Sequence, residues 1–261
     1  MAPPNIHKYK DVALVVYDSL APIYDRIMSH VDYEEWARLI ERIIEKFLMA
    51  QSPSILELGG GTGILSSLLI NRGFRYIGSD RSFSMCSVAR RRQVPFLCAD
   101  ARAIPIKSKF DLICFLYDGI NYLQTLDEYS SLFHETARHL SPGAFFLFDI
   151  TTETNSLNHF RNYLEYEDWG DYAYLRRSYY NKEKIEQTND ITIFRRVAYD
   201  SPLYEKKIEH HCQKVFSADV IARTIPAALF TIEGMWDGFS FHRYHFHSER
   251  IHFLLKRTTS L

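Results

Sequence analysis

The segment ILELGGGTGILSSLL, residues 55–69, is the most informative part of this sequence of 261 residues. Its apolar start predicts a buried strand, and the run that begins at Gly63 predicts a helix. The glycines between them permit positive φ angles and let the backbone approach a ligand closely at the N-terminus of that helix. This strand, turn and helix therefore predict a binding site for a nucleotide-like ligand at the edge of a sheet.

Short apolar runs alternate with helical segments on both sides of this stretch. The runs are residues 55–58, 76–79, 96–98, 112–117 and 145–150, and the helical segments are 63–72, 84–92 and 126–140. Such alternation predicts βαβ units around a parallel sheet that is buried on both faces. The last predicted strand, 244–256, follows the run 230–236 without a crossover helix, so it must run antiparallel to its neighbour.

The two remaining regions have different patterns. Residues 1–50 begin with a polar, Pro-containing arm and continue as an amphipathic helix over 33–47. Residues 152–216 change to a period of two, which predicts an antiparallel meander of three or four strands. Residues 217–229 then predict a helix that Ser217 caps and that Pro226 limits or bends near its end. We therefore expect an N-terminal helical lid (1–50), a core (51–151 and 217–261) and an inserted β subdomain (152–216) over the substrate site.

Composition narrows the class of protein. Hydrophobic residues make up 46% and charged residues 24%, as in folded globular proteins. No apolar run approaches the about 20 residues of a membrane span, and the start MAPPNIHKYKDV lacks the apolar core of a secretory signal, so we expect a cytoplasmic protein. A formal net charge of -1 gives no general attraction to nucleic acid or acidic membranes. Any anionic partner must be recognised locally.

The glycine turn permits two interpretations. A dinucleotide site requires GxGxxG, but counting from Gly59 the third glycine position is Ile64, so the match is partial. Asp80, about 20 positions further on, suits the ribose hydroxyls of either NAD or an adenosyl ligand. Glu57 would repel a pyrophosphate but suits a cationic ligand, and Asp100 is placed to accept a hydrogen bond from an adenine amino group.

These motifs, in this order, resemble those of the class I S-adenosylmethionine-dependent methyltransferases. The matching pieces are ELGGGTG at 57–63, Asp80, the pair Asp100-Ala101, FDLICFLYDGINYL at 110–123 and LSPGAFFLFDI at 140–150. The resemblance covers roughly residues 20–151 and the final hairpin. It implies an α/β fold with a Rossmann-like, seven-stranded, mostly parallel sheet, an antiparallel last strand and an antiparallel β insertion after the fifth strand.

The resemblance also assigns roles to residues around S-adenosylmethionine. It implies that Gly59, Gly61 and Gly63 give backbone approach to the methionine part, that Asp80 holds the ribose hydroxyls, and that Asp100 and the amide of Ala101 read adenine. Arg81 or Met85 would pack over adenine, although Met85 suits the core of its helix equally well. Glu57 would orient the glycine loop, or the amino group through water.

Aromatic residues of the N-terminal segment are expected above the cofactor. Tyr17, Tyr24, Tyr33 and Trp36 are candidates, because an aromatic ring attracts a cation such as the sulfonium. Tyr24 occupies the position that the family uses to reach the carboxylate end of the cofactor. Each of these rings could equally serve helix packing.

The segment YDGINY at 117–122 is expected where ligands converge at the end of the fourth strand. It resembles the sugar N-methyltransferases and related small-molecule enzymes, and differs from the NPPY or DPPY tetrad of enzymes that methylate nucleic acids and proteins. A backbone carbonyl near Tyr117, or the side chains of Asp118 and Asn121, would meet the amino group of methionine or the acceptor. We therefore expect a small-molecule substrate, no nucleic-acid partner and no membrane partner.

A base is optional for an amine acceptor, whereas a hydroxyl needs one. Candidates are Asp118, Asp149 and the histidines of FSFHRYHFH, of which we select His245. In an extended strand His245 and His247 would share a face that His242 does not, so no metal site is expected. The pairs Arg176-Arg177 and Arg195-Arg196 either clamp an anionic group or pair with nearby glutamates on a solvated face.

The sequence therefore predicts methyl transfer from S-adenosylmethionine to a small molecule, with S-adenosylhomocysteine as product. An amine acceptor is favoured over a hydroxyl or carboxylate, and a nucleotide-linked amino sugar is one candidate by analogy. Two alternatives stay open: a non-catalytic S-adenosylmethionine-binding regulatory or interaction protein, and an NAD-dependent oxidoreductase. The β meander would also provide the contact surface if the chain forms a homodimer and not a monomer.

Overall fold

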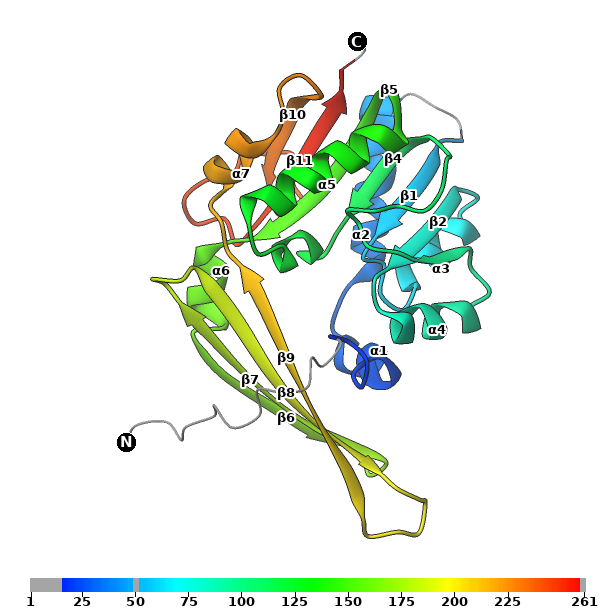
Figure 1. Cartoon of the computed structure of the whole chain (residues 1–261), viewed down its shortest axis with the longest axis vertical. Coiled ribbons are helices and arrows are strands. Elements are labelled where there is room, and N and C mark those ends of the chain that lie inside the picture. Colours follow the sequence, from blue (N-terminus) through cyan, green and yellow to red (C-terminus); the bar gives the residue numbers. More distant parts are fainter. Residues whose placement is uncertain (1–15, 49–51, 259–261) are drawn as a thin grey trace.

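The computed structural model describes residues 16–48 and 52–258, so the arm predicted at the extreme N-terminus lies outside the described residues. Its centre is a seven-stranded sheet with the strand order β10-β11-β5-β4-β1-β2-β3 (Figure 1). The strands are β1 (Ser54–Leu58), β2 (Arg75–Asp80), β3 (Phe96–Cys98), β4 (Phe110–Phe115), β5 (Leu140–Thr151), β10 (Phe230–Asp237) and β11 (Arg250–Arg257). Each apolar run predicted as a strand is confirmed, and the fold is the expected Rossmann-like α/β fold.

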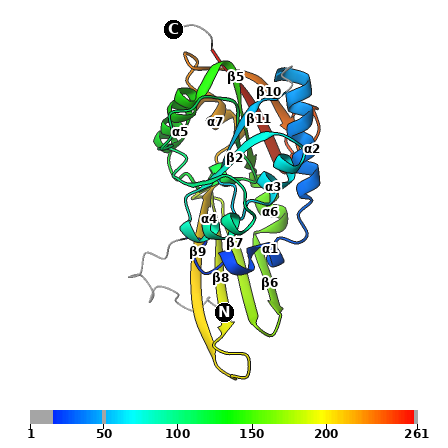
Figure 2. The same ribbon diagram turned by 90° about the vertical axis from the view of Figure 1, so that its right-hand side faces the viewer.

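Helices cover both faces of this sheet because its buried strands alternate their side chains between two cores. Leu56, Ile113 and Phe146 pack with α5 (Leu126–His139) and α7 (Ala218–Thr224). Ile55, Leu112 and Phe145, one position away, pack with α2 (Tyr33–Ile43) and α3 (Ile64–Asn71) on the other side. Figure 2 shows the sheet between α5 and α2. A further helix, α4 (Phe83–Arg91), follows β2.

The last strand runs antiparallel to its neighbours, as predicted. β11 pairs antiparallel with both β5 and β10, whereas the pairs β4·β5, β1·β4, β1·β2 and β2·β3 are parallel. Two predicted boundaries were wrong. β11 begins at Arg250 and not at Tyr244, because residues 238–249 form a loop with local turns such as Ser248 N–H to His245 O. α7 ends at Thr224, because Ile225 precedes Pro226 and is extended with ψ 121°.

The insertion after β5 forms a second sheet that projects beyond the end of the main one (Figure 1). Its elements are α6 (Glu153–His159), β6 (Asn162–Asp168), β7 (Tyr172–Asn181), β8 (Glu186–Arg196) and β9 (Tyr204–Lys214). The four strands pair antiparallel in the order β6-β7-β8-β9, so the meander has four strands. After β9 the chain continues into α7, which returns it to the main sheet.

The N-terminal segment connects the two sheets. The turns η1 (Ala21–Ile23) and α1 (Tyr24–Ile27) precede α2, which continues as a π-helical turn, η2 (Ile44–Leu48). Ile23 and Ile27 are buried against Tyr174 and Ile193 of the inserted sheet. The segment therefore lies between the inserted sheet and the main sheet. Within the described ranges, no helix is both long enough and apolar enough to cross a membrane.

Candidate active site

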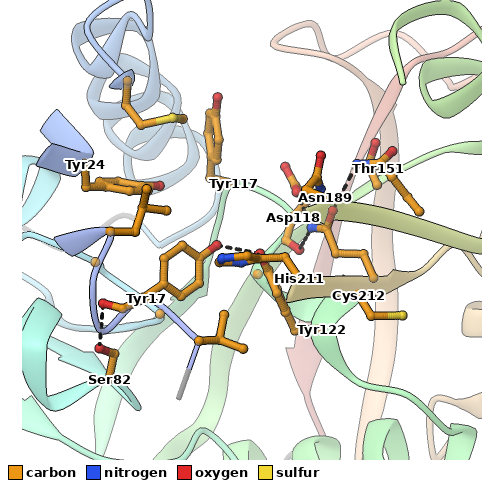
Figure 3. A pocket seen from close by; sticks show the side chains of 18 of the residues that line it. Tyr17, Tyr24, Ser82, Tyr117, Asp118, Tyr122, Thr151, Asn189, His211 and Cys212 are labelled. Atoms are coloured by element: carbon orange, nitrogen blue, oxygen red, sulfur yellow. Dashed lines mark hydrogen bonds between the residues drawn. The ribbon is translucent and has the colours of Figure 1, made fainter. Parts of the chain in front are cut away.

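A cavity of about 990 Å³ lies between the carboxyl ends of the parallel strands and the inserted sheet (Figure 3). Its walls are formed by the N-terminal segment, the glycine turn, the ends of β2, β3 and β4, and the strands β7 to β9. Most residues expected from the sequence line it: Tyr24, Gly59, Gly61, Asp80, Arg81, Met85, Asp100, Ala101, Tyr117 and Asp118. The cavity is continuous from these residues to the inserted sheet, which adds Arg176, Asn189 and His211.

The glycine turn presents backbone to this cavity at two of its three expected positions. Gly59 and Gly61 have φ angles of 65° and 56°, in the left-handed region. A Cβ on Gly59 would lie 2.7 Å from the ring of Phe115, so no larger residue fits without movement of that ring. Gly63 is different, because it precedes α3 and does not line the cavity, and its Cβ would lie 3.1 Å from Ala89 of α4.

Asp80 supports the turn and also reaches the cavity. Its Oδ2 accepts a hydrogen bond from Gly61 N–H at 2.9 Å, and its Oδ1 accepts one from Ser82 N–H at 2.8 Å. Burial raises the pKa of this carboxyl above its ordinary value, and the hydrogen bonds from Ser82 and Gly61 oppose that rise. Among the next residues, Arg81 is exposed at the rim, and Met85 is both buried in α4 and part of the cavity wall.

Asp100, after β3, is held by an arginine that was not singled out in the sequence. Its Oδ1 accepts hydrogen bonds from the backbone N–H and the Nε of Arg102, each at 2.9 Å, and Oδ2 accepts from the same guanidinium at 2.8 Å. The hydrogen bonds from the Arg102 side chain lower the pKa of Asp100. The carboxylate therefore remains an ionised acceptor with a fixed orientation beside Ala101.

Glu57 lies behind the turn and does not line the large cavity. It borders a small adjoining pocket of about 50 Å³ that Tyr33 and Trp36 also line. Tyr17 lines the large cavity, and Tyr24 lines both. Glu57 Oε2 accepts a hydrogen bond from Ser66 Oγ at 2.8 Å. Burial raises the pKa of the Glu57 carboxyl to about 7.

These residues fit an S-adenosylmethionine cofactor better than a dinucleotide. Two carboxylates, Asp80 and Asp100, follow neighbouring strands and reach one cavity, where ribose hydroxyls and an amino group are suitable donors. A Cβ on Gly60 would lie 2.6 Å from Glu57 Oε2, so a carboxyl group underlies the turn where a pyrophosphate would have to bind. The rings of Tyr24 and Tyr117 face the same space, which suits a cationic centre (Figure 3).

The end of β4 carries the second group of polar residues. Tyr117 and Asp118 have φ angles of 59° and 50°, a left-handed conformation that is costly for residues other than glycine. Asp118 Oδ1 accepts a hydrogen bond from Arg250 at 2.9 Å, and Oδ2 accepts one from Gln213 Nε2 at 2.6 Å. Asp118 N–H donates to Asp149 Oδ2 at 2.9 Å, which ties this backbone to the end of β5. Burial raises the pKa of both carboxyls, and Arg250 opposes that rise.

Asn121 and His245, the other expected catalytic residues, do not line the cavity. Asn121 is fully buried and links three segments, because its Nδ2 donates to Lys214 O at 2.8 Å and its Oδ1 accepts from Thr151 N–H at 3.0 Å. His245 lies in the loop before β11, where its Nε2 is 3.2 Å from an Asp237 carboxylate oxygen and its side chain is 59% exposed. No group of three His, Cys, Asp or Glu side chains in the described residues is arranged to hold a metal ion.

The two arginine pairs do not form an anion clamp. Arg176 lines the cavity and pairs with Glu165 at 2.6 Å, whereas Arg195 pairs with Glu205 at 2.7 Å outside it. Besides Arg102, three residues were not expected from the sequence: Gln213 and Arg250, which line the cavity, and Glu209, which accepts a hydrogen bond from the backbone of Tyr17 beside it. All three are polar residues in strands that were read only by their periodicity, so a polar residue at an inward-facing position was the available signal.

Comparisons with known proteins agree with this geometry. A family model described as a methyltransferase domain matches residues 55–143. The protein YqeM of Bacillus subtilis (strain 168), which carries a methyltransferase name, is 25% identical over 253 residues, covering 95% of this chain and 99% of that protein. The crystal structure of an S-adenosylmethionine-dependent methyltransferase from Clostridium acetobutylicum ATCC 824 has 27% identity and a TM-score of 0.76, covering 93% of this chain and 99% of that one.

The fold is also that of the sugar N-methyltransferase KedS8 from Streptoalloteichus sp ATCC 53650, with 19% identity, a TM-score of 0.76 and 99% of both chains covered. The protein is therefore an enzyme of the EC 2.1.1 type that uses S-adenosylmethionine. The two alternatives, an NAD-dependent oxidoreductase and a non-catalytic binding protein, are wrong. The glycine turn, the acidic residues that follow it and these similarities show that the chain belongs to the class I S-adenosylmethionine-dependent methyltransferases, of the small-molecule type.

Proposed function

We propose that the enzyme methylates an amine nitrogen of a polar small molecule that the inserted sheet holds against the cofactor. One observation carries this proposal: the cavity runs without interruption from Asp80 and Asp100 to Asn189 and His211 on the inserted sheet. Cofactor and acceptor would therefore share one enclosed space. When bound, S-adenosylmethionine supplies a methyl group that is already activated by its positively charged sulfur.

In one half of the cavity, the cofactor half, residues at the ends of the first three strands would hold S-adenosylmethionine. The Gly59 and Gly61 backbone would accommodate the methionine part, with Tyr24 packed above the turn. Asp80 would accept hydrogen bonds from the ribose hydroxyls, while Asp100 and Ala101 would contact adenine. Arg81 and Met85 would cover the adenine ring, and Tyr117 would contribute its backbone carbonyl and ring beside the methionine part.

The acceptor half is lined by polar side chains that suit a hydroxylated molecule. Asn155, Gln187 and Asn189 offer amide groups that donate and accept hydrogen bonds. The Asp118 carboxylate, 17% exposed at the cavity wall, favours an amine over an anionic acceptor. The protein's main contribution would be alignment of the acceptor lone pair, an effect that can supply up to about 7 to 11 kcal/mol.

A nucleotide-linked amino sugar is one acceptor of this description. The similarity to KedS8, which is named as a sugar N-methyltransferase, extends through the inserted sheet. It supports an amino sugar as one candidate acceptor. Arg176 reaches the cavity and could meet an anionic group of such a molecule, although Glu165 already pairs with it.

The test begins with calorimetric titration of the protein with S-adenosylmethionine, S-adenosylhomocysteine and NAD. Turnover is then screened by release of S-adenosylhomocysteine with matched pairs of acceptors: nucleotide-linked 4-amino sugars and their 4-hydroxy counterparts, free amino sugars and their parent sugars, and amino acids. We expect turnover with amines and not with the matched alcohols. Turnover confined to the alcohols would overturn the amine proposal.

Asp118→Asn provides a matched variant for the same assay. It should lower kcat/KM for the amine that turns over fastest, because it removes the negative charge at the wall of the acceptor half. Asp200→Asn is the control, since Asp200 is exposed in the β8–β9 connection. Equal kcat/KM for Asp118→Asn and the control would contradict the role given to Asp118.

A further inference from the structure

A buried acid and a buried imidazole lie next to the acceptor half of the cavity. Glu209 and His211 on β9 are only 1% and 2% exposed, and Glu209 Oε2 is 3.1 Å from His211 Nε2. His211 Nδ1 is 3.0 Å from the hydroxyl of Tyr122, which is 2.6 Å from the hydroxyl of Tyr17. Figure 3 shows Tyr17, Tyr122 and His211 converging in the pocket. Three separate parts of the chain thus form one hydrogen-bonded row.

The direction of these hydrogen bonds follows from Glu209. Its carboxylate also accepts backbone N–H groups of Tyr17 at 2.8 Å, Ser19 at 2.6 Å and Leu20 at 3.0 Å, so N–H donors meet both oxygens. An ionised carboxylate only accepts hydrogen bonds, and His211 therefore carries its hydrogen on Nε2. In the neutral imidazole Nδ1 is then the acceptor, so the Tyr122 hydroxyl donates to it and the Tyr17 hydroxyl donates to the Tyr122 oxygen.

This row ends with a Tyr17 oxygen that has a free lone pair, at the junction of the two halves of the cavity. The backbone carbonyl of Tyr17 accepts a hydrogen bond from Ser82 Oγ at 3.4 Å, and Ser82 N–H donates to the Asp80 carboxylate. The ring of Tyr17 lies 4.7 Å from the His211 ring on the opposite side. Tyr17 is therefore located between the cofactor half and the inserted sheet, where the acceptor atom must meet the methyl group.

We propose that Tyr17, Tyr122, His211 and Glu209 form a relay that removes the proton from the acceptor during methyl transfer. The proposal rests on the proposed function and adds the base that it leaves unassigned. The neutral acceptor nitrogen forms its bond to the methyl carbon as the bond from that carbon to sulfur breaks, with the electron pair left on sulfur. One acceptor proton then passes to the Tyr17 oxygen, the Tyr17 proton to Tyr122, and the Tyr122 proton to His211 Nδ1.

The charges balance at the end of this step. The positive charge that the sulfur loses is carried by the His211 imidazolium, which lies against the Glu209 carboxylate, and the methylated amine leaves neutral. Burial raises the pKa of the Tyr17 and Tyr122 hydroxyls well above the ordinary tyrosine value, so both phenols stay neutral and pass a proton on without storing charge. A hydroxyl acceptor would use the same relay.

The relay also depends on the position of the N-terminal segment. Glu209 accepts hydrogen bonds from the backbone of Tyr17, Ser19 and Leu20, and Tyr17 and Leu20 line the cavity on that side. The same carboxylate therefore fixes the segment and orients the imidazole. Packing of the N-terminal segment on β9 both closes the cavity and completes the relay.

The first test uses His211→Ala with the amine that turns over fastest in the screen. We expect kcat to fall about 100-fold, within the range that general bases contribute, and added imidazole to restore part of it. Tyr122→Phe should lower kcat without rescue by imidazole, since it breaks the row before the base. His247→Ala and Tyr199→Phe are matched controls, because His247 is exposed in a loop and Tyr199 is 99% exposed. Affinity for S-adenosylmethionine, measured by calorimetry, should remain unchanged in His211→Ala.

The second test does not depend on turnover. In protein labelled with ¹⁵N-histidine, NMR should show neutral His211 with its hydrogen on Nε2, and Tyr122→Phe should shift the Nδ1 resonance. Hydrogen on Nδ1, or an Nδ1 resonance that Tyr122→Phe leaves in place, would overturn the relay whatever the acceptor. If the wild-type enzyme turns over an amine and His211→Ala retains its kcat, or loses it without imidazole rescue, the relay is also wrong. If no amine turns over at all, the proposed acceptor class fails, and the NMR result still decides the relay.

Discussion

Arg250, at the start of the last strand, donates a hydrogen bond to Asp118 at 2.9 Å, although 132 positions separate the two residues. The same guanidinium also contacts Asp149, whose side chain is completely buried. One arginine thus compensates two carboxylates at the point where the backbone of Tyr117 and Asp118 is left-handed. Arg250 thereby links Asp118, in the wall of the cavity, to β11, the antiparallel last strand of the main sheet.

Replacement of Arg250 by methionine should therefore destabilise the protein. Removal of one partner from a buried ion pair typically costs about 3–5 kcal/mol, because a buried charge is left without compensation. Burial already raises the pKa of Asp118 and Asp149, and without Arg250 it would rise further. Carboxyls whose pKa is raised on folding favour the folded state at low pH, so the deficit of Arg250→Met should shrink as the pH falls.

Urea unfolding of wild type and variant between pH 5 and pH 8 measures this deficit. Arg243→Met is the matched control, since Arg243 is exposed in the loop before β11. A loss below about 1 kcal/mol at pH 8, the scale of an exposed ion pair, would mean that the two carboxylates do not depend on Arg250.

Asp80→Asn should weaken the binding of S-adenosylmethionine more than tenfold. A hydrogen bond to a charged group is worth about 1.5–3 kcal/mol. The variant loses the charge and keeps one oxygen, which can accept from Gly61 N–H but leaves Ser82 N–H without its partner. Calorimetric titration gives the affinity, and Asp200→Asn serves as the exposed control. Unchanged affinity in Asp80→Asn would show that the ribose does not bind at the end of β2.

Glu57 should make the stability of the cofactor-free protein depend on pH. Its pKa is raised from 4.5 to about 7 by burial, so its contribution is fully present below pH 4.5 and is lost as the pH rises through 7. That shift corresponds to roughly 3 kcal/mol for a fully buried group. Glu57→Gln should remove this dependence and gain stability relative to wild type at pH 8, while the exposed control Glu45→Gln should not. Parallel pH profiles for wild type and Glu57→Gln, measured by urea unfolding, would contradict the assignment.

The sequence predicted the elements whose pattern is local. The apolar runs, the glycine turn and the carboxylates at the ends of β2 and β3 follow one another along the chain, and their order alone indicated one binding edge. The helix α7 was predicted too long because a proline excludes the helical conformation of the residue before it. Ile225, which precedes Pro226, is therefore extended, and the helix ends at Thr224.

The missed parts depend on contacts that no local pattern contains. Arg250 reaches Asp118 across 132 positions, and Glu209 reaches the backbone of Tyr17 across 192. The period of two indicates that Glu209 and His211 lie on the same face of a strand, but it does not indicate which face is buried. Burial of that face depends on the N-terminal segment that packs against it.

Gly59→Ala should impair both the fold and cofactor binding through the ring of Phe115. A Cβ at position 59 would lie 2.7 Å from that ring, which also packs against Gly119 and is only 7% exposed, so it has little room to move. Overpacking costs about 1–3 kcal/mol, and the left-handed backbone adds about 1–2 kcal/mol.

Gly73→Ala separates these two contributions. Gly73 has a φ of 89°, and no atom lies within 4 Å of its Cβ position, so alanine there incurs backbone strain without the clash. We expect Gly59→Ala to lose more unfolding free energy than Gly73→Ala and to lose affinity for S-adenosylmethionine as well. The double variant Gly59→Ala/Phe115→Leu should recover part of both, because the smaller side chain makes room for the methyl group. If the double variant is no better than Gly59→Ala, the loss comes from the backbone at the turn, and the close approach to Phe115 is not what requires glycine there.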